Sequence, residues 1–247
     1  MFDSISIPTI LVSYVALLFS LSVHEASHAT TAYWLEDDTA ARLGRMTLNP
    51  LAHIDPIGTV LFPLIGMTTG IPMIGWAKPV PVNPANYTRR FSMRTGDAIV
   101  SAAGPGSNVV LALLSLILLT LGLRFMIPGH DQRWAYFAGS LNGFESLSMM
   151  NVDPTTSMFL ALCGRLILVN FGLALFNLLP IGPLDGSAIL RAFLPYRMAQ
   201  VLDKYRQHMY IVLLALVFLG GMKYLFVPAF NLYFDFLKWV APTLLGV

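Results

Sequence analysis

Long uncharged blocks of apolar residues alternate with short charged segments along this chain. A helix needs about 20 residues to cross the roughly 30 Å of hydrocarbon in a bilayer. The pattern therefore predicts four membrane-spanning helices, at about residues 7–35, 98–123, 157–179 and 208–222. A fifth block, 224–240, is rich in aromatic residues and also contains Asp235 and Lys238, so it is either a last span or an interfacial helix.

Residues 57–76 are also uncharged, but four glycines and two prolines interrupt them. Each glycine costs a helix about 1 kcal/mol and each interior proline about 3 kcal/mol, which disfavours a straight span. Irregular backbone at membrane depth has to be satisfied by protein or by a watery cavity. We therefore predict a re-entrant loop or a β-hairpin on the cytoplasmic side.

Positive charges are distributed unequally between the two sides of the predicted spans. Six Lys or Arg residues lie in 36–95 and four lie between the third and fourth spans, whereas two lie between the second and third spans. Cytoplasmic loops carry the excess of positive charge, so the N-terminus is predicted to be outside and the first span to run inward. This orientation requires that residues 57–76 do not cross the membrane.

Composition narrows the class of protein further. Of the 247 residues, 56% are apolar and 11% are charged, against about 25% charged in soluble domains. The net charge of +2, without a long Lys/Arg run, argues against binding of nucleic acid. Cys163 is the only cysteine and cannot form a disulfide within the chain. An integral membrane protein is the class that remains.

The first span contains one segment whose side chains could bind a metal ion. Its only charged residue is Glu25, within His24-Glu25-Ala26-Ser27-His28. Positions four apart share a helix face, so the two histidines can bind one Zn²⁺, and Glu25 can take a proton from a bound water. The alternative, core histidines beside a stray carboxylate, is disfavoured because ionisable groups inside a membrane are costly and usually functional.

A hydrolytic zinc site needs a third protein ligand and an open position. Asp185 is the only carboxylate at the inner end of the third span, where prolines and glycines break the helix. A broken helix can turn this carboxylate inward, although Asp185 is alternatively the cap of the next helix. The ligands meet if the first and third spans run the same way, which the single crossing at 98–123 provides. One zinc ion per chain is therefore predicted.

The combination of motifs resembles the site-2 protease family of intramembrane zinc metalloproteases. The matching residues are the His24 to His28 motif followed by Ala29, and the later pattern of Asn177, Pro180 and Leu184-Asp185-Gly186. Further stretches are similar to the compact bacterial subgroup; they lie at 44–50, 53–59, 75–84 and 103–108. The resemblance covers about residues 22–186, and the C-terminal third matches only in hydropathy.

The resemblance implies a fold and a set of roles. The expected fold is an all-α polytopic membrane protein: one protease domain over 1–247, with a three-helix catalytic core in about 7–186 and accessory helices in about 187–247. Zinc would lie below the cytoplasmic surface of a bacterial plasma membrane. The resemblance assigns His24, His28 and Asp185 as zinc ligands, Glu25 as the base, and Asn177 as a residue that binds substrate or stabilises the intermediate.

The family also implies substrates and regulation. The expected substrate is a transmembrane helix of another protein, which has to unwind locally before it is cut in regulated intramembrane proteolysis. Many members carry a PDZ or CBS domain, but no segment here is long and polar enough for either, so any regulatory membrane partner is left open. The Gly/Pro-rich stretch 57–84 could bind unwound substrate by strand addition, or its Lys78-Pro79-Val80-Pro81 run is a rigid connector.

Five residues are additional substrate-binding candidates: Lys78, Pro79, Val80, His53 and Asn108. His53 is alternatively a structural loop histidine. Asn108 is alternatively an interhelical hydrogen-bonding residue or a support for the zinc site, and Asn170 is expected to join helices as well.

Two rival functions are weighed against proteolysis. A metal or proton transporter would use the buried His, Glu and Asp residues as a relay, but it needs polar residues toward both leaflets, and the outer halves of these spans are almost bare. A relative that binds transmembrane helices without cutting them would have no need of Glu25.

Overall fold

The computed structural model describes residues 7–69, 75–127, 129, 132–150 and 152–245. Every regular element among these residues is helical, which confirms the all-α prediction. The α-helices are α1 (Ile7–Trp34), α2 (Thr39–Arg42), α3 (Phe62–Thr69), α4 (Met93–Met126), α5 (Arg133–Asn142), α6 (Phe144–Ser148), α7 (Pro154–Asn177), α8 (Asp185–Phe193), α9 (Tyr196–Phe218) and α10 (Lys223–Leu245). Shorter helical turns are η1 (Pro50–Ala52), η2 (Pro56–Leu61) and η3 (Pro84–Asn86).

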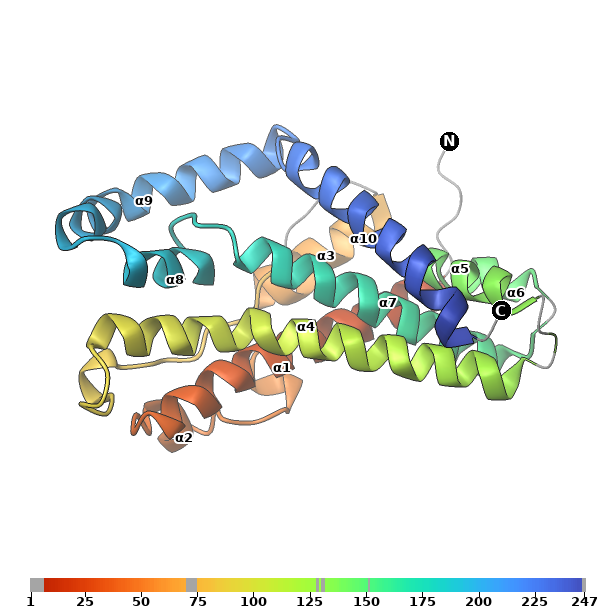
Figure 1. Ribbon diagram of the computed structural model, residues 1–247, viewed down its shortest axis with the longest axis horizontal. Helices are drawn as coiled ribbons and strands as arrows, with labels where there is room; N and C mark the ends of the chain where they lie inside the picture. The colour runs from red at the N-terminus through yellow and green to blue at the C-terminus, as the bar shows by residue number, and fades with distance from the viewer. Residues whose placement is uncertain (1–6, 70–74, 128, 130–131, 151, 246–247) are drawn as a thin grey trace.

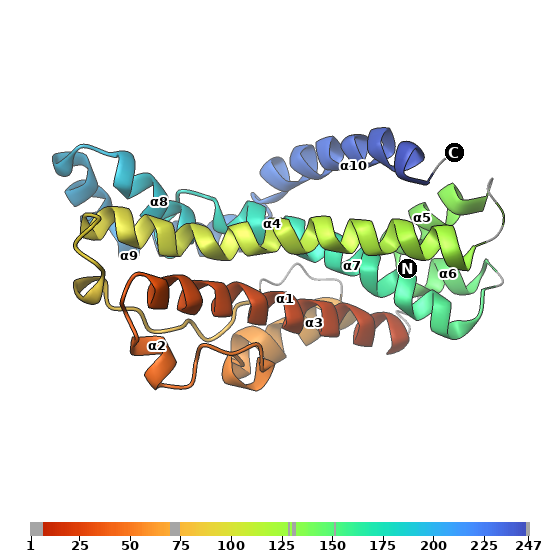
Figure 2. The ribbon, with the colours of Figure 1, turned by 60° about the horizontal axis from the view of Figure 1, so that its bottom comes forward.

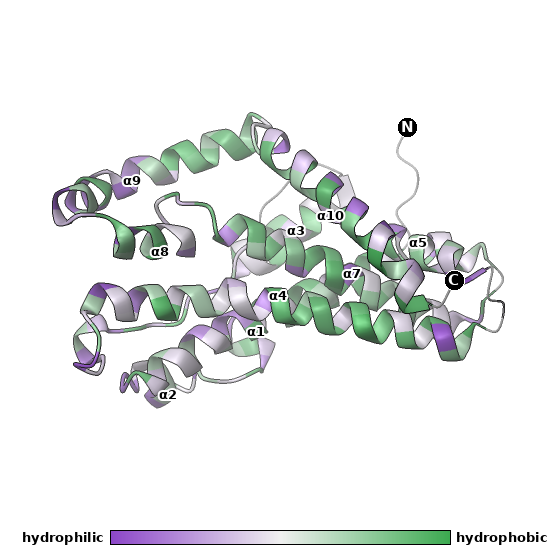
Figure 3. Ribbon diagram, viewed as in Figure 1, coloured by the Kyte–Doolittle hydropathy of each residue, from purple (hydrophilic) through white to green (hydrophobic). Residues whose placement is uncertain are grey.

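Helices α1, α4 and α7 are each long and apolar enough to cross a membrane, as the hydrophobic pattern predicts. Helix α4 packs against both of the others, and α1 also contacts α7, so the three form one bundle (Figure 1). Apolar residues dominate these helices, whereas polar residues gather at the end that holds α2, α8 and the start of α9 (Figure 3). The protein is therefore a polytopic membrane protein with a three-helix core.

Helices α1 and α7 run in the same direction and α4 runs opposite to them (Figure 2). Helix α1 contacts α6 and leads to α2 at its C-terminal end, while α7 starts after α6 and leads to α8. The histidines of α1 and the residue that opens α8 therefore face the same end of the bundle. This arrangement is the one that a single crossing between the two spans requires.

Capping residues mark where the core helices begin. The Ser92 side chain accepts a hydrogen bond from Thr95 N–H at 3.1 Å at the start of α4. Asp153 does the same for Thr156 N–H at 2.9 Å at the start of α7, where Pro154 takes the first helical position.

The C-terminal third differs from the predicted pattern of spans at 208–222 and 224–240. Helices α9 and α10 are bent by 69° at a short break, and the two together, rather than either alone, qualify as one candidate span. The first half of α9 carries several charges, which leaves too short an apolar stretch for a separate span. Gly220, with φ of 71°, lies in the break and adopts the left-handed conformation that glycine tolerates.

Residues 57–69 are helical rather than extended. Asp55 accepts hydrogen bonds from Ile57 N–H and Gly58 N–H at the start of η2, and α3 follows directly. Pro63 is tolerated because it lies in the first turn of α3. Residues 70–74 lie outside the described part, and 75–83 run back in extended form, with Trp76 N–H bonded to Gly58 O at 3.1 Å. The described residues of the segment form no hairpin, and entry of this segment into the bilayer stays a prediction.

Two differently composed regions fill the bundle. Toward α5 and α6, the interior is mostly an apolar cluster that includes Leu119, Leu123, Phe137, Leu160 and Ile167. Toward α2 and α8, buried histidine, asparagine, serine and carboxylate side chains replace the apolar ones. The polar region holds the candidate site.

Candidate metal centre and active site

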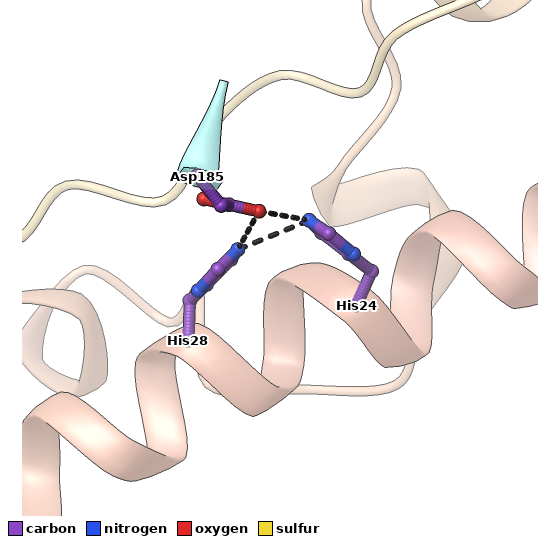
Figure 4. Close-up of side chains that lie close together, drawn as sticks. All are labelled: His24, His28 and Asp185. Carbon is purple, nitrogen blue, oxygen red and sulfur yellow. Dashed lines mark hydrogen bonds and ion pairs between the residues drawn. The ribbon is translucent and has the colours of Figure 1, made fainter. Parts of the chain in front are cut away.

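Three side chains that the sequence predicts as metal ligands converge at one point (Figure 4). Asp185 Oδ2 lies 3.3 Å from His24 Nε2 and 3.5 Å from His28 Nε2. The two Nε2 atoms are 3.0 Å apart. Both histidines are buried on one face of α1, and Asp185 is the first residue of α8.

The outer nitrogens of the two imidazoles are each engaged by an oxygen. His28 Nδ1 lies 2.7 Å from the carbonyl oxygen of Val100, and His24 Nδ1 lies 2.7 Å from Asn108 Oδ1. A carbonyl oxygen can only accept, so each Nδ1 carries the hydrogen of its neutral ring and each Nε2 presents a lone pair. Two imidazole lone pairs and a carboxylate oxygen then face one another without a proton between them, which a cation would stabilise.

The spacing and surroundings of the three atoms fit a zinc ion. Tetrahedral zinc with bonds of about 2.0–2.1 Å separates its ligand atoms by roughly 3.3–3.4 Å. Asp185 Oδ2 is buried and has no hydrogen-bond partner among the described residues. Gly104 of α4 closes the site from the side, and a Cβ atom there would lie 2.6 Å from His24 Nε2. The side chains present therefore match the donor set and the size of a three-ligand zinc site.

The chain turn between α7 and α8 places Asp185. Gly186 lets this turn fold tightly onto the end of α7, because a Cβ there would lie 2.5 Å from the carbonyl oxygen of Leu179. Leu184 occupies the N-cap position of α8, and no side chain caps that helix. The alternative prediction of Asp185 as a helix cap is therefore not what the structure has.

Glu25 is buried beside the histidines and is held by main chain. Its Oε2 atom accepts a hydrogen bond of 2.8 Å from the backbone N–H of Val80. Val80 belongs to the segment 75–83, which is bonded to α1 at Glu25 and to Asp37 just after that helix. The predicted base and a predicted substrate-binding residue are thus in direct contact, but through the backbone of the latter.

The extended segment is tied to its surroundings at several further points. Lys78 N–H donates to the carbonyl oxygen of His53 at 2.9 Å, and the guanidinium of Arg45 donates to the carbonyl oxygen of Lys78 at 2.7 Å. Pro79 has no N–H to offer. These bonds occupy the groups that strand addition would need at Lys78 and Val80, so the structure favours the rigid-connector interpretation there.

Asp37 is a buried residue that sequence reasoning missed. Its carboxylate accepts hydrogen bonds from Asn83 N–H at 2.7 Å, from Asn86 Nδ2 at 3.0 Å and from Thr39. Burial alone would raise the pKa of Asp37, but these hydrogen bonds lower it below its ordinary value. The signal in the sequence was an Asp two residues before a Thr at the end of an apolar block, which is typical of a side-chain turn.

His53 and Asn108 do not line the cavity next to the metal centre. His53 is buried, and its Nε2 donates to the carbonyl oxygen of Thr47 at 2.8 Å, within the loop that precedes η2. Asn108 instead contacts His24 at Nδ1, the ring nitrogen that does not face Asp185. Substrate binding by either residue stays a prediction, and the geometry gives both a supporting position.

A cavity of about 420 Å³ opens beside the metal centre. His24, Glu25 and Asn177 form its polar part, and Pro79 lies at its edge. Apolar and aromatic side chains form the rest: Leu21, Phe62, Trp76, Leu173, Phe176, Leu184, Tyr210, Leu213, Leu214, Val217 and Phe218. The residues from α9 were not among the sequence candidates, because hydropathy alone carries no information about which face of a helix meets a site.

Comparison with known proteins decides the family. Residues 71–220 match the family described as Peptidase family M50, which is more than half of the chain. The chain belongs to peptidase family M50, the site-2 protease family. This membership supports a zinc metalloprotease and confirms the family that the motifs predict.

Three relatives are similar to this M50 chain over most of its length. "Putative zinc metalloprotease YwhC" of Bacillus subtilis is 34% identical over 219 residues, which cover 88% of this chain and 84% of that protein. "Putative zinc metalloprotease Rip2" of Mycolicibacterium smegmatis is 28% identical over 89% of this chain and 71% of its own length. The protein of the same name from Mycobacterium tuberculosis H37Rv is 30% identical over 81% of this chain and 63% of its own. No solved structure matches the chain.

Proposed function

We propose that this M50 protein is an intramembrane zinc endopeptidase that hydrolyses a peptide bond in or near a transmembrane helix of another membrane protein. The observation that carries the proposal is the convergence of His24, His28 and Asp185 beside a cavity that His24 and Glu25 line. Family membership supports peptide hydrolysis over metal or proton transport.

The chain's own residues divide the chemistry between them. A zinc ion bound by the three ligands would lower the pKa of a coordinated water to about 7 and polarise the scissile carbonyl. Glu25 would accept the proton of the attacking water and deliver it to the leaving amine. Val80 N–H holds one oxygen of that carboxylate, which leaves the other for the proton.

We propose that Asn177 assists by donating a hydrogen bond to the reacting carbonyl. It lines the cavity, and its Nδ2 donates to the carbonyl oxygen of Leu173 at 3.0 Å in the same helix. Rotation of the side chain would turn this donor toward a substrate oxygen. Removal of one such donor from an oxyanion site costs a hydrolase about 10²–10³-fold in rate.

The size of the cavity restricts the form of the substrate. One turn of a helix 10–12 Å wide and 5.4 Å long occupies roughly 400–600 Å³. The cavity, at about 420 Å³, has room for about that much chain, and most of its wall is apolar. The apolar wall supports an apolar membrane segment as the substrate. We propose that this segment unwinds before it reaches Glu25, because a helix keeps its peptide groups hydrogen-bonded and covered.

The surroundings of the protein follow from the same proposal. The distribution of Lys and Arg supports an N-terminus outside and a metal centre near the cytoplasmic face of a bacterial inner membrane. The lipid bilayer and a transmembrane protein substrate are the proposed partners.

The decisive experiment replaces the proposed base. Full-length protein in lipid nanodiscs is incubated with zinc and a quenched-fluorescent peptide that contains an apolar segment interrupted by glycine and proline. Glu25→Gln is expected to bind one zinc per chain and to cut the peptide at least 100-fold more slowly, within the range for general acid–base catalysis. The exposed Glu145 of α6 provides the matched control, because Glu145→Gln should cut at the rate of the unmodified protein. Cleavage by Glu25→Gln at the unmodified rate would contradict the proposed function.

A further inference from the structure

A buried chain of hydrogen bonds leads away from His24 through all three core helices. Asn108 Nδ2 of α4 donates to Asn170 Oδ1 of α7 at 2.7 Å, and Asn170 Nδ2 donates to Ser20 Oγ of α1 at 2.8 Å. Asn108, Asn170 and Ser20 are each 0% exposed. The hydrogen bonds run from Ser20, one helical turn before His24 on α1, to Asn170 of α7, then to Asn108 of α4 and finally to His24.

The bonds that Ser20 and Asn170 make to main-chain carbonyl oxygens decide which group donates in each of these hydrogen bonds. Asn170 Nδ2 also lies 2.8 Å from the carbonyl oxygen of Leu166, which can only accept. The Ser20 hydroxyl donates to the carbonyl oxygen of Ala16 at 2.7 Å, so Ser20 Oγ accepts from Asn170. Both hydrogens of the Asn170 amide are therefore used, and its oxygen has to face Asn108.

The orientation of Asn170 also fixes the orientation of Asn108 and the tautomer of His24. Because Asn170 presents an oxygen, the Asn108 atom facing it has to be the Nδ2 donor, and Asn108 Oδ1 then faces His24. An oxygen at 2.7 Å from His24 Nδ1 requires a hydrogen on that nitrogen. His24 Nε2 is left bare and aimed at Asp185, the tautomer that a metal ligand needs.

We propose that Asn170 is a positioning residue of the metal centre: acting through Asn108, it holds His24 in the tautomer whose Nε2 binds zinc. The inference rests on the proposed ligand set. His28 obtains the same tautomer directly from the carbonyl oxygen of Val100. The two histidines are thus set independently, one by main chain and one by a relay of two amides.

The first test measures zinc affinity rather than proteolysis. Asn170→Leu keeps the approximate volume and removes the 2.7 Å partner of the Asn108 amide, which leaves only the long contact of 3.5 Å from Asn108 Nδ2 to the carbonyl oxygen of Ser20 to orient it. Zinc affinity of the purified full-length protein, measured by competition with a chromogenic chelator, is expected to fall about 10–100-fold, as for other outer-shell partners of ligating histidines. Ser157→Ala is the matched control, because this buried hydroxyl of the same helix has no hydrogen-bond partner among the described residues.

A second set of variants separates positioning from packing. Asn108→Leu should lose zinc affinity. Asn108→Asp keeps an oxygen acceptor facing His24 but places a second oxygen against Asn170 Oδ1, so it should lose less zinc affinity than Asn108→Leu. Asn170→Leu added to Asn108→Leu should cause no further loss, because Asn170 acts only through Asn108. A purely structural role would lower thermal stability in every case and make the losses multiply.

Two results would overturn the inference: zinc affinity of folded Asn170→Leu within twofold of the unmodified protein, or equal losses for Asn108→Asp and Asn108→Leu. If Asn170→Leu does not fold, Asn170→Ala is measured in its place against the same twofold limit. Failure of the proposed function has a different signature. A protein that binds zinc in this pattern but cuts no peptide leaves the relay intact and refutes the protease.

Discussion

A methyl group at Gly104 would collide with the ligands of the candidate metal centre. A Cβ atom built at Gly104 lies 2.6 Å from both Cε1 and Nε2 of His24, and it also overlaps Nε2 of His28. Non-bonded carbon atoms prefer a separation of about 3.5–4.0 Å, so the overlap is roughly 1 Å. In the variant Gly104→Ala, either α4 moves away from α1 or the two imidazoles turn away from Asp185.

The expected size of the effect differs between stability and activity. Overpacking a tight interior costs about 1–3 kcal/mol, while replacing a helical glycine by alanine returns about 1 kcal/mol. The net loss of stability is therefore about 0–2 kcal/mol. A displacement of about 1 Å at a reacting group costs about 10²-fold in rate. Gly104→Ala should accordingly stay folded, bind zinc more weakly and cut the fluorescent peptide about 100-fold more slowly.

The same helix supplies a matched control two residues further on. A Cβ atom at Gly106 meets nothing within 4 Å, so Gly106→Ala changes helix propensity alone. This variant should be equally active and equally or slightly more stable in thermal unfolding. If Gly104→Ala and Gly106→Ala have the same zinc affinity and the same kcat/KM, the close approach of α4 to the ligands has no bearing on the site, and the reasoning is refuted.

Three further predictions concern metal, cavity and pH. Removal of metal with 1,10-phenanthroline should abolish cleavage, and zinc should restore it in the unmodified protein but not in Asp185→Ala, as measured by metal content and peptide cleavage. Leu213→Trp should fill part of the cavity behind Glu25 and lower kcat/KM at least tenfold with zinc affinity unchanged; an unchanged kcat/KM would mean that substrate does not enter there. Because hydrogen bonds lower the pKa of Asp37 below 3.8, its contribution to stability is present above about pH 4 and is lost as the pH falls through the lower folded value. Asp37→Asn should therefore unfold at a lower temperature at pH 7, and this difference should shrink below pH 4; a difference that is constant with pH would argue against the charged form.

The sequence alone was enough to predict the three residues of the candidate metal centre. His24 and His28 are four residues apart on a helix that hydropathy alone reveals, so their shared face follows from helix geometry. Asp185 was identifiable because it is the only carboxylate beside a broken helix end. The convergence of these side chains in the structure depends on the common direction of α1 and α7, which charge counting also predicts.

Contacts between distant parts of the chain were beyond the reach of pattern reasoning. Asn170 and Ser20 are 150 positions apart, and Glu25 and Val80 are 55 apart. Hydropathy specifies that a helix is buried in a membrane, but it does not specify which face meets which neighbour. For the same reason the sequence left two roles open for Asn108, interhelical bonding as the favoured one and support of the metal centre as the alternative, and its contacts with His24 and Asn170 become visible only in three dimensions.

The bend between α9 and α10 shows a different limit. Residues 208–222 and 224–240 each have an apolar pattern, but the charges in the first half of α9 and the glycines at 220 and 221 make a bent pair of helices out of them. The inner face of α9 then supplies Tyr210, Leu213 and Val217 to the cavity. A segment without any motif thus forms a wall of the site, because its position is set by the bend and not by its own sequence pattern.

The way in which Glu25 is held has a consequence for the proposed reaction. A general base has to be oriented firmly and still exchange its proton, and an acidic side chain as its partner would compete for that proton. The backbone N–H of Val80 avoids the conflict, because it donates a hydrogen bond to Glu25 but does not titrate. Pro79 and Pro81 on either side restrict the backbone that presents this N–H, and Asn83 N–H anchors the same segment to Asp37 at the end of α1. The segment is therefore bonded to the inner half of α1 at Glu25 and to Asp37 just beyond that helix, and its rigid backbone at Val80 orients the Glu25 carboxylate.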